Sequence, residues 1–100
     1  MHEDRDTFLR YADGEMLAIV FLFNQPRSEE ADTQLKNLTR ELIDTARDCG
    51  GRYYLPYRLH ATQEQFLAAY PQATKFFARK RHYDPDERFQ NQFYLTNGRN

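Results

Sequence analysis

The stretch Gly50-Gly51-Arg52-Tyr53-Tyr54-Leu55-Pro56-Tyr57 decides how this chain is divided. Its two glycines stand where a helix must stop, because glycine readily adopts the left-handed conformation that ends many helices. The residues that follow are rich in tyrosine and favour extended backbone, and Pro56 cannot donate to a strand ladder. The stretch therefore predicts a helix that ends near Gly50 and a strand over residues 52–57.

A long amphipathic helix is predicted immediately upstream, over residues 29–48. Ser28 is a suitable N-cap, and acidic residues in the first turn complement the helix dipole. The single cysteine, Cys49, lies on the apolar stripe of this helix, so we expect a buried and unreactive thiol. The stripe repeats at spacings of three and four and consists of Ala31, Leu35, Leu38, Leu42, Ala46 and Cys49.

A β-hairpin is predicted at the N-terminal end. Residues 7–11 are β-prone, and the dipeptide Asp13-Gly14 suits a tight turn. Residues 16–23, MLAIVFLF, are apolar without alternation, which is typical of a strand covered on both faces. One long helix cannot cover both faces of such a sheet, so we expect a second copy or a missing part of a larger protein to do so.

Two short helices and an extended tail are predicted downstream. Residues 62–65, TQEQ, have the form of a capping box and begin a helix. Pro71 suits the first turn of another helix, in which residues 76–77 turn inward. That helix ends at Asp84, because a residue that precedes proline is disfavoured in a helix. Residues 89–94 then favour extended backbone.

Together these elements predict an α+β fold in a single domain of residues 1–100. An antiparallel sheet, made of the hairpin and strand 52–57, is packed by one long helix and two short C-terminal helices, like part of a ferredoxin-like domain. The net charge of −1 gives no general electrostatic case for binding nucleic acid or an anionic membrane. The longest apolar run is too short to span a bilayer, and the charged N-terminus lacks a signal-peptide core, so the default location is the cytoplasm.

Three groups of residues have side chains that could form a site. The histidines His2, His60 and His82 are scattered without metal-ligand spacing, so we expect no metal site. The run of residues 75–81 mixes cations with aromatics, as in proteins that bind single strands, but on a helix its cations simply face solvent. The phenols of Tyr54 and Tyr57 could face one cavity at the end of strand 52–57, or both could be packing residues.

The order of the C-terminal fragments resembles the closing segment of FAD-linked oxidoreductases related to vanillyl-alcohol oxidase. Aldonolactone oxidases, alditol oxidase and decaprenylphosphoryl-ribose oxidase belong to this family. The resemblance covers about the last half of the chain. The matching fragments are GGRYYLPY at residues 50–57, QFLAAYP at 65–71, FFARKR at 76–81, YDP at 83–85 and FQN at 89–91.

The resemblance implies that this chain is the C-terminal substrate or cap domain of a FAD-dependent oxidoreductase. Such an enzyme oxidises an alcohol or sugar-like substrate by hydride transfer to the flavin. By position, Tyr54 and Tyr57 would be catalytic, although some relatives carry a lysine at the place of Tyr57. Tyr54 and Asn91 would contact the flavin.

The family's FAD-binding domain is not part of these residues, so the resemblance also implies a partner. FAD and the small-molecule substrate would bind with a FAD-binding domain of the same or a neighbouring polypeptide, and this chain would be inactive alone. Two alternatives from other classes stay open. One is a stand-alone α+β domain that dimerises and binds a ligand or partner, and the other is a nucleic-acid-binding module.

Overall fold

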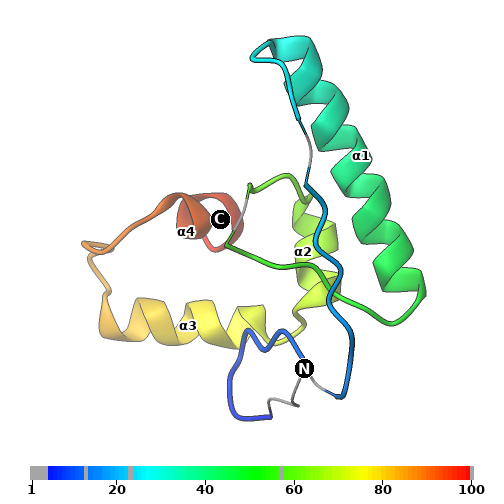
Figure 1. Cartoon of the computed structure of the whole chain (residues 1–100). Helices are drawn as coiled ribbons and strands as arrows, with labels where there is room; N and C mark the ends of the chain where they lie inside the picture. The colour runs from blue at the N-terminus through cyan, green and yellow to red at the C-terminus, as the bar shows by residue number, and fades with distance from the viewer. Residues whose placement is uncertain (1–4, 13, 23, 57, 100) are drawn as a thin grey trace.

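The chain is built from four helices in the computed structural model, which describes residues 5–12, 14–22, 24–56 and 58–99. The body is flat, with extents of 41 × 34 × 19 Å. α1 packs against α2, and α2 packs against α4, while α3 runs beside the N-terminal loop (Figure 1). The helices are α1 (Glu29–Asp48), α2 (Gln63–Ala69), α3 (Ala73–Tyr83) and α4 (Gln92–Asn97).

The predicted α+β fold is wrong, since the described residues contain no strand and therefore no antiparallel or ferredoxin-like sheet. Residues 8–9 form a turn, residues 16–22 are extended without forming a ladder, and residues 55–56 turn. Three positions of the prediction lie outside the described residues. They are Asp13, in the predicted hairpin turn, and Phe23 and Tyr57, at the ends of the two predicted strands.

Side chains, not backbone pairing, hold the segment that was predicted to be strand 52–57. The hydroxyl of Tyr70, on the C-terminal side of α2, donates a hydrogen bond to the carbonyl oxygen of Tyr53. The guanidinium of Arg52 donates to the carbonyl oxygen of Arg10 at 2.5 Å. Residues 52–53 are therefore held close to Tyr70 and to Arg10 by side-chain hydrogen bonds, without a strand ladder.

The long helix is confirmed at both ends. The Ser28 hydroxyl accepts a hydrogen bond from the Ala31 amide at 3.1 Å, and Gly50 has a φ of 77°, which is the left-handed conformation expected after a helix. The stripe is only half-buried, however, and Ile43 is the one buried residue among the described side chains of α1. Cys49 is exposed, so the prediction of a buried thiol is wrong, because Cys49 is the C-cap that follows the last helical residue, Asp48, beyond the buried part of α1 at Ile43.

An aromatic core joins α2, α3 and α4. Phe66 is fully buried, and its ring lies 5.7–6.1 Å from the ring centres of three neighbours, Tyr70, Phe77 and Phe93. The predicted inward orientation of Phe77 is thus confirmed, and Phe76 packs partly buried against the same core. The predicted extended tail at residues 89–94 is wrong from Gln92 on, since α4 begins there with Asn91 as its N-cap.

The capping box at the start of α2 is confirmed and also joins two helices. The Thr62 hydroxyl accepts from the Gln65 amide, and the Gln65 side-chain oxygen accepts from the Thr62 amide. The Gln65 side-chain nitrogen reaches α1, where it donates to the carbonyl oxygen of Arg40 at 2.9 Å and to the Asp44 carboxylate at 2.8 Å. This buried amide therefore fixes how α1 and α2 meet.

Gly98 offers a test of how tightly the aromatic core is packed. A Cβ at this position would overlap the ring of Phe77 and approach the ring of Tyr94 at 2.8 Å, and both rings are buried. We expect Gly98→Ala to lower the free energy of unfolding by about 1–3 kcal/mol, measured by urea denaturation. Gly14→Ala is the control, because nothing lies within 4 Å of its Cβ position. Equal stability of both variants would contradict the packing described.

Candidate functional site

Asn91 lies between two hollows on the surface of the chain. One is an open groove with a volume of about 780 Å³, and the other is a smaller pocket of about 210 Å³. The groove separates the segment that follows Tyr54 from the first turn of α4. It is lined by Leu9, Leu55, Pro56, Arg58, Leu59, His60, Asn91, Gln92, Phe93 and Thr96.

The described residues that line the groove mix apolar and polar side chains, and none of them is acidic. Leu9, Leu55 and Leu59 contribute hydrocarbon, while Asn91 and Gln92 contribute amides. Pockets that combine apolar contact with a few polar groups are typical of small-molecule sites. The arrangement suits a small molecule that carries both an apolar portion and hydrogen-bonding oxygens.

Arg58 is held in place by a small network beside the start of α1. Its Nη1 lies 2.7 Å from the Asp32 carboxylate and 3.3 Å from the side-chain oxygen of Gln25. The Gln25 amide also donates to Asp32, at 2.9 Å, and the bonds from Gln25 and Arg58 hold the pKa of Asp32 below its usual range. Neither bond of Arg58 uses Nε or Nη2, the edge that pairs side-on with two oxygens.

His60 is a second polar residue of the groove wall. Its backbone carbonyl accepts a hydrogen bond from Arg40 Nε at 2.8 Å, which ties this wall to α1. Burial lowers the pKa of the His60 imidazole, so the ring is neutral at neutral pH. Its buried Nδ1 has no hydrogen-bond partner among the described residues.

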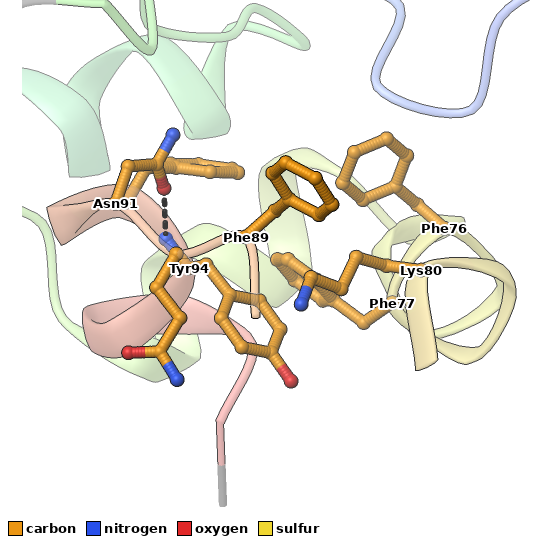
Figure 2. A pocket seen from close by; sticks show the side chains of 8 residues that line it. Phe76, Phe77, Lys80, Phe89, Asn91 and Tyr94 are labelled. Atoms are coloured by element: carbon orange, nitrogen blue, oxygen red, sulfur yellow. Dashed lines mark hydrogen bonds between the residues drawn. The ribbon is translucent and has the colours of Figure 1, made fainter. Parts of the chain in front are cut away.

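The smaller pocket is lined mainly by aromatic rings (Figure 2). The Lys80 ammonium, its one cation, lies 4.2 Å from the centre of the Tyr94 ring and 2.6 Å from the Asp84 carboxylate. Its charge is therefore already balanced. Phe89 stands at the rim and is 80% exposed. The lining residues are Phe76, Phe77, Lys80, Phe89, Gln90, Asn91, Phe93 and Tyr94.

The predicted site residues are only partly brought together. Asn91 lines both hollows, and its side-chain oxygen accepts from the Tyr94 amide at 2.8 Å, as Figure 2 shows. Tyr54 is half-exposed, packs edge-on against Tyr11 at 5.5 Å, and lines neither hollow. Tyr57 lies outside the described residues, so the shared cavity of Tyr54 and Tyr57 stays a prediction.

Arg58 and His60 were not singled out as site residues from the sequence. Arg58 follows directly after the Gly50–Tyr57 stretch, and that adjacency is the signal that could have drawn attention to it. His60 was considered only as a metal ligand and read as polar surface. Neither residue shows a spacing that marks it as functional.

Wider comparisons do not assign the chain to a class. No family model matches this chain, and no curated protein or solved structure is significantly similar to it. Across the residues that the structure describes, no helix combines the length and apolar character needed to cross a membrane. In the same residues, no three histidine, cysteine or acidic side chains gather where they could hold a metal ion. The candidate site therefore rests on the geometry of the groove.

Asp84 provides a pH test of the turn that supports the aromatic pocket. Its carboxylate accepts from Lys80 and from the Phe89 and Arg88 amides, and these bonds lower its pKa from 3.8 to about 2. A lowered pKa stabilises the fold above pH 3.8, and the contribution is lost as the pH falls towards 2. We expect Asp84→Asn to lower the melting temperature at about pH 6. The difference in melting temperature from the unmutated chain should shrink as the pH falls towards about 2.

Circular dichroism melts across this pH range measure the effect. Asp86→Asn is the matched control, because Asp86 makes only an exposed ion pair with Arg88 at 3.7 Å. A cost of Asp84→Asn that does not change with pH would contradict the role assigned to the carboxylate.

Proposed function

We propose that this chain is the C-terminal substrate or cap domain of a FAD-dependent oxidoreductase. The complete enzyme would oxidise an alcohol or sugar-like substrate by hydride transfer to flavin, and the chain would be inactive alone. One observation carries the proposal: residues 55–56 and Asn91 line the same groove. These residues come from the first and last fragments of the resemblance, which are separated by more than thirty positions in the sequence.

The described residues do not fit FAD as a whole. Gly50 and Gly51 follow a helix instead of preceding one, and the space beside Gly98 is filled by the rings of Phe77 and Tyr94. No glycine-rich loop at a helix start is therefore available in the described chain to hold a pyrophosphate. The FAD would be held by a FAD-binding domain of the same or a neighbouring polypeptide, and this chain would contribute a wall.

Within that wall, the chain's own residues would bind and orient the substrate. The Nε and Nη2 edge of Arg58 would donate to substrate oxygens, while Leu55 and Leu59 exclude water from its carbon skeleton. The Asn91 amide nitrogen would donate to the flavin or substrate, because the side-chain oxygen already caps α4. Catalytic roles for Tyr54 and Tyr57, as hydrogen-bond donors to the substrate hydroxyl, rest on the resemblance alone.

The proposal is tested by adding the partner. The purified chain is expected to remain colourless on titration with FAD, because it lacks a phosphate cradle. Co-expression with the FAD-binding polypeptide encoded in the same or the adjacent reading frame is expected to give a yellow complex that oxidises an alcohol. A chain that binds FAD tightly by itself, or that forms no complex with the flavoprotein, would overturn the proposal. A dimeric chain that binds a small molecule without flavin would favour the stand-alone domain.

Arg58 gives the most direct mutational test in the complete enzyme. We expect Arg58→Gln to raise the KM about tenfold or more, because charge-assisted hydrogen bonds to the substrate are lost. Arg47→Gln is the control, since Arg47 is an exposed arginine of α1 that pairs with Asp44 at 3.5 Å and does not line the groove. Steady-state kinetics on both variants measure the effect. An unchanged KM in Arg58→Gln would show that Arg58 does not bind the substrate.

A further inference from the structure

The smaller, aromatic pocket between α3 and α4 has the size of a single ring. Its volume is about 210 Å³. An apolar cavity of about 150 Å³ holds one benzene molecule, and sites for drug-sized ligands begin at about 300 Å³. The pocket therefore suits one six-membered ring with a small substituent and is too small for a molecule such as a flavin.

The aromatic walls of this pocket are fixed before any ligand binds. Phe77 and Tyr94 are each 4% exposed, and their ring centres lie 5.8 Å apart. The ring of Phe93 lies 5.8 Å from that of Phe77. The Tyr94 hydroxyl donates to the Glu87 carboxylate at 2.5 Å, which holds the Tyr94 ring in place. Fixed rings favour an aromatic ligand, because rings attract one another in edge-to-face and offset-stacked arrangements and rigid walls reduce the entropy lost on binding.

Phe89 adds a ring at the rim of the pocket. A single exposed phenylalanine is ordinary by itself. The backbone of Phe89 is held, however, because its amide donates to the Asp84 carboxylate at 3.0 Å and the Arg88 amide donates to the same carboxylate at 2.9 Å. The exposed ring is thus kept beside the pocket, where it can stack over a ring that enters.

Lys80 supplies the pocket with a hydrogen-bond donor. Its ammonium lies among the lining rings (Figure 2), 4.2 Å from the centre of the Tyr94 ring, and among the described residues it donates to the Asp84 carboxylate. An ammonium carries three protons, so a proton is left for an oxygen in the pocket. Because Asp84 already balances the charge, an uncharged oxygen is a better acceptor here than a carboxylate, which Asp84 would repel.

We propose that this pocket binds a small uncharged molecule that consists of one planar aromatic ring with a carbonyl or hydroxyl oxygen attached. The ring lies against Phe77 and Phe93 and under Phe89, and the oxygen accepts a hydrogen bond from Lys80. This inference does not rest on the proposed function, since it involves neither flavin nor a partner. A chain that forms no complex with a flavoprotein would leave it standing.

NMR titration of the full chain at about pH 7 with three probes tests the ligand class. Benzamide is expected to shift the amides of residues 76–77, 89–90 and 93–94 in a saturable way, with a Kd on the order of 1 mM or lower. Cyclohexanecarboxamide carries the same polar group on a ring that is not planar, and benzoate carries a charge. Each is expected to bind about fivefold more weakly than benzamide.

Four variants test the roles of the side chains. Phe89→Ala and Lys80→Met are each expected to weaken benzamide binding about fivefold, through loss of stacking and loss of the donor. Tyr83→Ala is the control for Phe89→Ala, because Tyr83 is 77% exposed on α3 and does not line the pocket, and it should change the Kd by less than about twofold. Asp84→Asn leaves the Lys80 charge unbalanced and is expected to make benzoate the tighter ligand. Circular dichroism identifies the variants that keep their helices.

Each outcome supports or contradicts a part of the proposal. The absence of a saturable benzamide shift, or a shift confined to residues elsewhere in the chain, overturns the site. Equal affinity for cyclohexanecarboxamide overturns the planar ring as the recognised feature. Unchanged binding in Lys80→Met overturns the donor, and unchanged binding in Phe89→Ala overturns the stacking at the rim. If Asp84→Asn keeps its helices and still prefers benzamide, the balancing role of Asp84 is wrong.

Discussion

The hydrogen bond from the Tyr70 hydroxyl to the Tyr53 carbonyl links the aromatic core to the chain segment that shapes the groove. Tyr70 is almost completely buried, and burial raises the pKa of its phenol and raises the pKa of Tyr53 to about 12. Both phenols are therefore protonated at physiological pH, and Tyr70 is always able to donate. The Arg52 guanidinium lies 5.7 Å from the centre of the Tyr70 ring and adds a second contact at the same place. This anchor holds the segment beside the core, where Leu55 also packs against the aromatic cluster.

Much of the helical structure was predictable because helix ends are encoded locally. Helix caps depend on backbone groups only a few residues away. The N-caps Ser28 and Thr62 and the left-handed Gly50 all behave in the structure as the sequence predicts. Asp84 likewise ends α3, although that helix begins at Ala73, two residues later than Pro71. The start of α4 carried a comparable signal in Asn91, but the aromatic residues around it favoured an extended interpretation.

The absence of a sheet from the described residues was not predictable in the same way, because a strand is defined by its pairing partner. Residues 16–22 have strand-like composition and extended backbone, yet composition does not supply a neighbouring strand. The groove also depends on contacts that the sequence alone does not reveal. Asn91 was placed by resemblance, whereas the orientation of Arg58 depends on Asp32 and Gln25, which lie 26 and 33 positions away in the sequence. Contacts over such separations leave no periodic trace in a single sequence.

The side chain of Gln65 also restricts which residues can occupy its position. A capping box accepts glutamate as readily as glutamine at its third residue, because either side-chain oxygen can receive the N-cap amide. Here the other end of the side chain must donate twice, to the Arg40 carbonyl and to the Asp44 carboxylate, and a carboxylate has no proton to give. Glutamate would therefore place two like charges together inside a helix contact. A substitution that local helix rules treat as conservative is forbidden by tertiary structure, so variation at this position should follow the identity of residue 44.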